Sequence, residues 1–249
     1  MTLTHKKMCT FTLIMHELIK TQLAAIASEE KAQIIRRFFK TGKGEYGEGD
    51  IFIGVTVPQI RSIAIQNADN ANFITVANLL DSPVHEHRLC GLLILVEQFR
   101  RCRKTHQHQK EIVDFYILNA HKANNWDLVD LTAPKILGQW LLENPFSALL
   151  DRLSYSENMW VQRIAIVSTL TQIRVSKFDD TLRLAERYLT HPHPLIHKAT
   201  GWMLREVGKK SETTLLDFLN KHTHSMSRTT LRYAIERLSP TLRSYYMTL

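Results

Sequence analysis

The sequence predicts an all-α fold in which antiparallel helix pairs repeat along the chain. Helix-breaking residues are scarce, with 9 glycines and 7 prolines among 249 residues. Apolar residues recur at helical spacing through most of the chain. The second helices of successive pairs follow one another at about 35 to 40 residues, the period of HEAT or armadillo units. We therefore expect a curved solenoid of HEAT-like helix pairs, an α–α superhelix.

The N-terminal residues favour an arm followed by two helices. We expect residues 1–10 to form a flexible arm and residues 11–249 to form a single repeat domain. A first helix is expected over Phe11–Ala27. Ser28 is then placed to cap a second helix, which runs to about Lys40.

A glycine-dense segment, Thr41–Asp50, follows the second expected helix. No strand precedes it, and no Ser or Thr follows its Gly-Lys to open a helix, so it does not match a phosphate-binding loop. We interpret it as a flexible connection. The next residues, Ile51–Val57, favour a short extended piece, which cannot form a sheet alone.

The rest of the chain alternates between apolar helical segments and short polar breaks. The helices expected there span Gln59–Gln66, Phe73–Leu80, His85–Arg101, Glu111–Ala120, Asn124–Leu142, Pro145–Leu153, a segment opened by Ser156, Lys177–Leu189, a segment opened by Pro194, Ser211–Lys221 and Arg228–Leu238. Each second helix begins with a basic or polar side chain, and these are Arg88, Asp130, Arg163, Lys198 and Arg232. Second helices usually line the concave wall of a solenoid, where a row of positive charges suits a duplex backbone. The alternative is that these charges are simply solvated.

The formal net charge of +8 favours a polyanionic partner, with nucleic acid as the first candidate. No apolar run approaches the roughly 20 residues that span a bilayer. The segment Phe11–Met15 is too short and too interrupted by Thr to indicate a signal peptide. Cys9, Cys90 and Cys102 lack metal or redox spacing. We expect a cytoplasmic protein with no membrane partner.

The stretch Asn124–Leu142 has the most informative spacing in the chain. Trp126 and Asp130 are four residues apart, so a helix places them one above the other on one side. Pro134 has no N–H to bond the carbonyl of Asp130, so we expect a bend at this carboxylate. An indole beside a carboxylate at a helix irregularity favours a functional site. The alternatives are a core tryptophan, a solvated Asp130 and a capping role for Asp127.

Other kinds of chemistry have less support. His191, His193 and His197 are separated by prolines and have no carboxylate cluster beside them. The segment His85–His87 does not form the helical zinc motif, so we expect no metal. A serine or cysteine nucleophile has no elbow motif. A sugar hydrolase needs paired carboxylates, and Asp127 is better suited to capping a helix than to serving as a second catalytic acid.

Three segments together resemble one known family. They are Trp126–Asp130 (Trp-Asp-Leu-Val-Asp), Trp160–Arg163 (Trp-Val-Gln-Arg) and Lys198–Glu206, which contains Gly-Trp-Met-Leu-Arg. The family is that of the alkylpurine DNA glycosylases built from HEAT-like repeats, the AlkD type. Further similar segments are Arg37–Gly42, His85–Arg88 and Arg228–Ala234, so the likeness extends over Ile34–Glu236.

The resemblance implies a monofunctional DNA glycosylase that excises cationic N3- or N7-alkylated purines from duplex DNA without a cofactor. It places the catalytic carboxylate at Asp130, the active-site tryptophans at Trp126 and Trp202, and the nearby arginine at Arg163. Members of this family often have a basic residue at the position of Gln162.

This chemistry suits the residue types. An alkylated purine already carries a positive charge, so it leaves without strong acid catalysis. An ionised Asp130 can stabilise an oxocarbenium-like sugar and position water. Trp126 and Trp202 offer aromatic faces to the deoxyribose and the developing charge. We expect Arg163 and Lys198 to hold phosphates, and Arg163 to keep Asp130 ionised.

Further contacts to DNA are expected from five basic residues: Arg88, Lys198, Arg205, Arg228 and Arg232. We expect the protein to act as a monomer. Two alternatives stay open, a non-catalytic HEAT-like nucleic-acid-binding module and a protein scaffold. Retention of Asp130 and both tryptophans argues against the first alternative, and the positive charge argues against the second.

Overall fold

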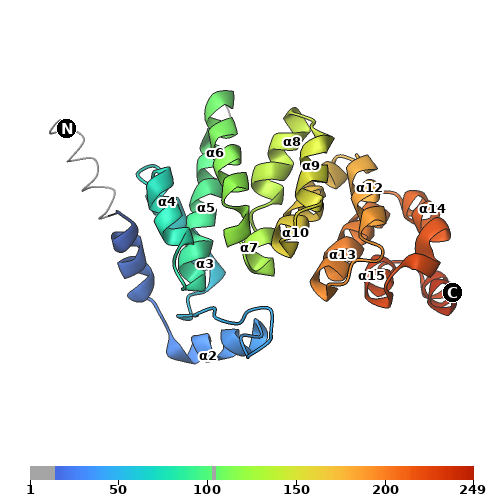
Figure 1. The fold of residues 1–249 in the computed structure, drawn as a ribbon, viewed down its shortest axis with the longest axis horizontal. Helices are drawn as coiled ribbons and strands as arrows, with labels where there is room; N and C mark the ends of the chain where they lie inside the picture. Colours follow the sequence, from blue (N-terminus) through green and yellow to red (C-terminus); the bar gives the residue numbers. More distant parts are fainter. Residues whose placement is uncertain (1–14, 103–104) are drawn as a thin grey trace. The chain divides into compact units, whose positions relative to one another are not determined.

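The structure is a computed structural model that describes residues 15–102 and 105–249. Within these ranges the regular secondary structure is helical, apart from one isolated bridge between Ile51 and Val84 (Figure 1). The predicted all-α class is therefore confirmed. None of the described helices is both long and apolar enough to cross a bilayer.

The start of the chain agrees with the sequence where it can be compared. The helix expected over Phe11–Ala27 is observed over residues 15–24. The flexible arm expected over residues 1–10 lies outside the described residues. The described chain forms two compact units, which meet in the sequence between Leu128 and Val129. The expectation of a single domain stays a prediction.

The first unit packs its helices around a long, largely buried helix, α5 (His85–Arg101), which contacts its neighbours on both sides. After residues 15–24, the other helices of this unit are α2 (Glu29–Phe38), α3 (Val57–Asn67), α4 (Phe73–Leu80), α6 (His106–Leu118) and the 3-10 turn Ala120–Lys122. Ser28 caps α2 as expected, because its side chain accepts a hydrogen bond from the amide of Lys31. The backbone of Gly54 has a φ of 80°, a conformation that favours glycine.

The expected helix over Asn124–Leu142 is not continuous. The structure has α7 over Trp126–Asp130, a π-helical turn over Pro134–Gly138 and α8 over Gln139–Glu143. The regular α-helix therefore ends at the carboxylate-bearing residue, as the missing N–H of Pro134 led us to expect. The prediction of one helix over Asn124–Leu142 was wrong in extending the helix through Pro134.

The second unit stacks helices in pairs along the sequence. They are α9 (Ser147–Ser154), α10 (Met159–Ser168), α11 (Leu170–Arg174), α12 (Asp179–Arg187), α13 (Pro194–Lys210), α14 (Glu212–His222), the 3-10 turn Thr223–Ser225, α15 (Arg228–Ala234) and α16 (Pro240–Thr248). The long α13 packs against α10, α14 and α15. Gly201 permits the close approach to α15, because a Cβ there would lie 2.5 Å from the carbonyl oxygen of Thr230. The final helix, α16, was missed in the sequence, although Ser239 and Pro240 form an ordinary helix start.

Candidate active site

Asp130 and Arg163 form a bidentate ion pair within the second unit. Asp130 is the last residue of α7, and Arg163 lies in the first half of α10. The Nε and Nη2 atoms of Arg163 donate to Oδ1 and Oδ2 of Asp130 at 2.9 and 2.8 Å. Such a bidentate pair fixes the plane of the carboxylate and stabilises its negative charge.

Solvent reaches the two partners of this pair unequally. The side chain of Arg163 is only 5% exposed, and its third nitrogen donates to the carbonyl of Leu195 at 2.5 Å. The side chain of Asp130 is 16% exposed. We expected Arg163 both to bind a phosphate group and to keep Asp130 ionised. The structure instead places its guanidinium inside the protein, where it orients a carboxylate that solvent still reaches.

The start of α13 lies beside this pair. Leu195, which accepts from Arg163, is in its first turn, and His193 caps the helix by accepting from the Leu195 amide at 3.1 Å. Burial lowers the pKa of His191 and of His193. Both imidazoles are therefore neutral at pH 7. Among the described residues no group of three or more His, Cys, Asp or Glu could hold a metal ion.

Lys198 and Trp202 follow on α13, four residues apart and hence on one side of the helix. Lys198 is exposed and Trp202 is half-buried. The chain therefore presents an ammonium group and an indole from the helix that contacts Arg163. This arrangement leaves Lys198, rather than Arg163, free to meet a phosphate group.

Trp126 is held by an aromatic group in the first unit. Phe39 stacks on the indole, with ring centroids 5.0 Å apart and an interplanar angle of 14°. Phe38 meets it edge-on at 5.7 Å. The indole Nε1 donates to the hydroxyl of Tyr46 at 3.3 Å. Trp126 is thus half-buried, neither a fully enclosed core residue nor a loose surface ring.

Asp127 belongs to a buried charge network that consists of Asp50, His85, Arg88 and Asp127. His85 joins the two carboxylates, with Nε2 2.9 Å from Asp127 and Nδ1 3.3 Å from Asp50. Arg88 donates to Asp50 at 2.5 Å and to the carbonyl of Ser82 at 2.8 Å. Asp127 lies in the first turn of α7, as expected, but its carboxylate bonds His85 instead of capping the helix.

The charge state of this network follows from its contacts. Burial opposes the imidazolium form of His85, but the charge and hydrogen bond of Asp127, with the Asp50 hydrogen bond, raise the pKa of His85 to about 9. Burial alone would raise the pKa of Asp50. Its hydrogen bonds to His85 and Asn125 and the charge of Arg88 lower it instead. At neutral pH His85 is therefore positively charged and Asp50 is negatively charged.

The expected DNA-contacting residues differ in their exposure. Arg88 is buried within the charge network, so the structure gives it an internal role instead of the surface contact we expected. Arg205 is 19% exposed and is paired with Glu236. Arg228 is exposed and donates to the carbonyl of Met247 at 2.5 Å. The local sequence pattern gave charge and helical position, but it could not show which partner each side chain meets.

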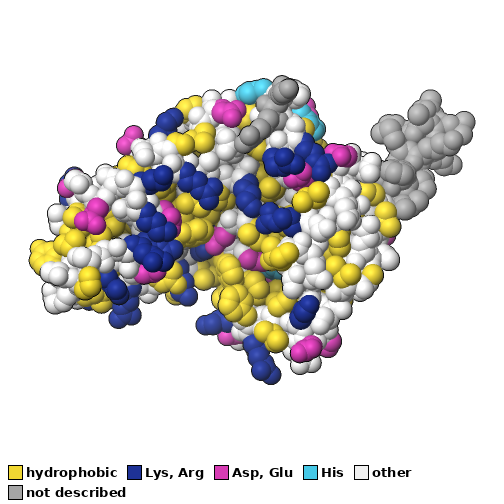
Figure 2. All heavy atoms as spheres, turned by 180° about the vertical axis from the view of Figure 1, so that it is seen from behind, with side chains coloured by type: hydrophobic (Ala, Val, Ile, Leu, Met, Phe, Trp, Pro, Cys, Tyr) yellow, Lys and Arg dark blue, Asp and Glu magenta, His cyan; other side chains and the backbone are white. Residues whose placement is uncertain are grey.

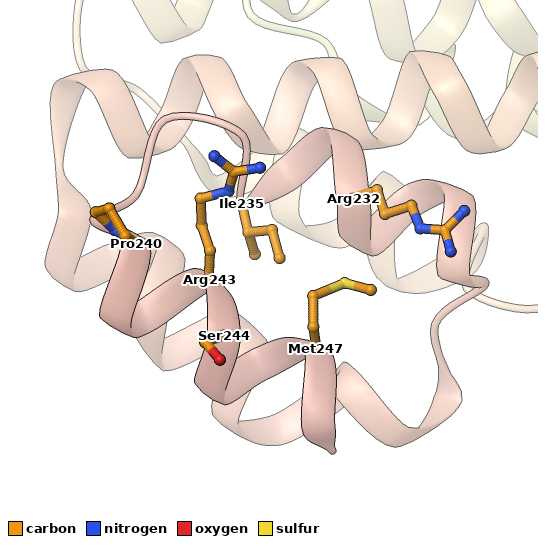
Figure 3. A pocket seen from close by; sticks show the side chains of 6 residues that line it. All are labelled: Arg232, Ile235, Pro240, Arg243, Ser244 and Met247. Carbon is orange, nitrogen blue, oxygen red and sulfur yellow. The ribbon is translucent and has the colours of Figure 1, made fainter.

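Arg232 lines a shallow pocket between α15 and α16. Figure 3 shows its guanidinium and that of Arg243 at the edges of this pocket, with the apolar side chains of Ile235 and Met247 between them. Figure 2 shows one face of the molecule, where many Lys and Arg side chains lie among apolar ones. Such a surface suits a polyanion, in agreement with the net charge.

Comparison with known proteins identifies the family. A family model described as DNA alkylation repair enzyme matches residues 19–238. The chain belongs to the DNA alkylation repair enzyme family. The resemblance inferred from the three sequence motifs is thereby confirmed.

One solved structure of this kind can be compared directly. It is described as a predicted DNA alkylation repair enzyme from Enterococcus faecalis, with 16% sequence identity and a TM-score of 0.65. The match covers 86% of this chain and 97% of that chain, and at this identity it shows the shared fold alone. No curated protein gives a significant match.

The aromatic and charged residues around Trp126 were missed by sequence reasoning. Tyr46, Asp50 and His85 are 80, 75 and 42 residues distant in sequence from the partners that they contact. The available signal was a tyrosine and an aspartate inside an otherwise glycine-rich segment. A flexible connection does not need either residue.

Proposed function

We propose that this protein is a monofunctional DNA glycosylase that excises cationic N3- or N7-alkylated purines from duplex DNA. The observation that carries the proposal is the Asp130 carboxylate, held by two hydrogen bonds from buried Arg163 and still 16% exposed. Membership of the DNA alkylation repair family supports DNA as the substrate. The net charge of +8 supports it further.

The reaction breaks the bond between C1′ of the deoxyribose and the purine nitrogen. The bonding electron pair neutralises the cationic base, which leaves without being protonated. The sugar gains oxocarbenium character, and the negative charge of Asp130 stabilises it. Water adds to C1′ and loses one proton, which Asp130 accepts and passes to solvent.

The other site residues prepare this step. Arg163 keeps the carboxylate in one orientation, so no reorganisation is needed as charge develops. Trp126 and Trp202 offer aromatic faces to the sugar and its cationic charge. Lys198 binds a backbone phosphate near the lesion.

The test is release of base from methylated duplex DNA. Wild-type protein is expected to release 7-methylguanine or 3-methyladenine above the spontaneous rate, measured by chromatography of the free bases. Asp130→Asn is expected to reduce the rate at least about a hundredfold, since it removes the central electrostatic group.

A matched control is Asp180→Asn in the same unit. Asp180 is also paired with an arginine, Arg183 at 2.6 Å, and its side chain is 14% exposed. It lies on α12, outside the three sequence motifs. Its variant is expected to retain the wild-type rate. Tight duplex binding without base release would favour a non-catalytic binding module, and absence of both at low salt would favour a protein scaffold.

A further inference from the structure

The glycine-dense segment Thr41–Asp50 is folded back onto the end of α2. The amide of Gly47 donates to the carbonyl of Lys40 at 3.2 Å, and a Cβ at Gly47 would lie 2.6 Å from the carbonyl oxygen of Phe39. Two glutamate side chains of the segment accept from its own glycine amides at 2.9 and 2.7 Å. These contacts give the segment a defined conformation, so it is more than a connection between helices.

Asp50 anchors the end of this segment next to α7. It accepts from Arg88 at 2.5 Å and from the side-chain amide of Asn125 at 3.2 Å, and its own side chain is 5% exposed. The side-chain oxygen of Asn125 in turn accepts from the backbone amide of Trp126 at 2.8 Å. The segment is therefore tied, through one intervening side chain, to the backbone of Trp126.

Tyr46 makes a second connection, to the ring of Trp126 itself. Its hydroxyl accepts from the indole Nε1 at 3.3 Å, while Phe39 stacks against the ring plane. Burial raises the pKa of Tyr46, so the hydroxyl stays protonated at neutral pH. The hydrogen bond fixes the rotation of the indole within its plane, and the stacking fixes its tilt.

We propose that the segment Thr41–Asp50 positions the indole of Trp126 for base excision, with Tyr46 as the positioning residue and Asp50 as its anchor. The inference rests on the proposed function, in which Trp126 faces the deoxyribose. An aromatic ring can favour a cationic sugar only if its face is presented in one orientation. The segment supplies this orientation from a part of the chain that is distant in sequence.

A variant that removes a single oxygen atom separates positioning from folding. Tyr46→Phe keeps the aromatic ring and removes the hydrogen-bond acceptor of the indole. The matched control is Tyr245→Phe, because Tyr245 lies on α16 with 54% of its surface exposed. The single-turnover rate of base release and the affinity for methylated duplex are measured for both. Tyr46→Phe is expected to slow release about fivefold and to leave affinity within about twofold, while the control matches wild type.

A spectroscopic measurement tests the same contact without activity. The chain has 4 tryptophans, so a ¹⁵N–¹H spectrum contains four indole signals, and Trp126→Phe identifies the signal of Trp126. Tyr46→Phe is expected to shift this signal and leave the other three in place, and Tyr245→Phe to shift none. An unmoved Trp126 signal would overturn the proposal, because the indole would not depend on Tyr46.

The outcomes distinguish this inference from the proposed function. If wild type releases base and Tyr46→Phe releases it equally fast, the positioning role fails and the glycosylase assignment stands. If wild type releases no base while the Trp126 signal shifts in Tyr46→Phe, the glycosylase assignment fails and the hold of the segment on the indole stands.

Discussion

Two buried arginines in this chain each hold a carboxylate, Arg88 through one hydrogen bond and Arg163 through two, and the two carboxylates differ in access to solvent. Arg88 holds Asp50 in the first unit, and both side chains are 5% exposed. Arg163 holds Asp130 in the second unit, where the arginine is 5% exposed but the carboxylate is 16% exposed. A sealed pair can only support the fold, whereas an open carboxylate on a buried arginine can meet a substrate. Solvent access therefore separates Asp50 from Asp130, while its place in the Trp-Asp-Leu-Val-Asp motif separates Asp130 from the similarly exposed Asp180.

The largest expected effect comes from removing the arginine of the open pair. Arg163→Ala removes the bidentate partner of the partly buried Asp130, and we expect the free energy of unfolding to fall by about 3–5 kcal/mol. Urea denaturation measures this change. The double variant Arg163→Ala with Asp130→Asn is expected to recover part of the loss, because the carboxylate that Arg163 neutralised is then uncharged as well.

If the effects of Arg163→Ala and Asp130→Asn on the free energy of unfolding are strictly additive, this account of the pair is contradicted.

Arg88→Ala is the corresponding variant in the sealed pair of Arg88 and Asp50. It is also expected to destabilise the protein, since it removes one of the two positively charged partners of buried Asp50, Arg88 and His85.

The sealed network is expected to make stability depend on pH. His85 has a pKa of about 9 in the folded protein, against an ordinary value of 6.5. The folded state therefore holds a proton that the unfolded state loses between these values. The contribution is complete below pH 6.5 and is lost as pH rises through 9, with a total on the order of 3 kcal/mol.

Urea denaturation of wild type and His85→Gln across this pH range checks the prediction. The decline is expected to be shallower in His85→Gln. His87→Gln is the control, because burial lowers the pKa of His87 to about 4, outside the window. An unchanged decline in His85→Gln would remove His85 as its source.

The smallest expected effect concerns phosphate binding by Lys198. This exposed residue is free of the buried pair, so Lys198→Ala is expected to weaken duplex binding at every sequence. The slope of log affinity against log salt should become shallower by about one unit. Lys177→Ala, an exposed lysine in the turn between α11 and α12, should leave the slope unchanged. Equal slopes for wild type and Lys198→Ala would exclude this phosphate contact.

Short-range patterns predicted much of the fold. The expected bounds of α4 and α5 agree with the structure, and Ser28 caps α2 as expected. These features depend on residues within one or two helical turns, where spacing and capping preferences apply. The irregularity at Asp130 was also predictable, because a proline acts on the carbonyl four residues earlier.

Features that depend on distant partners could not be predicted from such patterns. Arg88 begins a helix and carries a charge, so sequence alone favoured the surface. Its partner Asp50 lies 38 residues away, in a segment that glycine content marked as flexible. Arg163 differs, because the family resemblance led us to expect it near Asp130, 33 residues distant, whereas its burial was not expected. Spacing and family resemblance identified the catalytic candidates, but only the structure could show how exposed their side chains are.

The central claim is that Asp130 acts in the reaction and that Asp127, three residues earlier, supports the fold. Single-turnover release of 7-methylguanine by Asp130→Asn and Asp127→Asn, both at a temperature where they are folded, tests this claim most directly. We expect Asp130→Asn to lose at least about a hundredfold in rate and Asp127→Asn to stay within about tenfold of wild type. Equal losses in the two variants, or a larger loss in Asp127→Asn, would contradict the assignment.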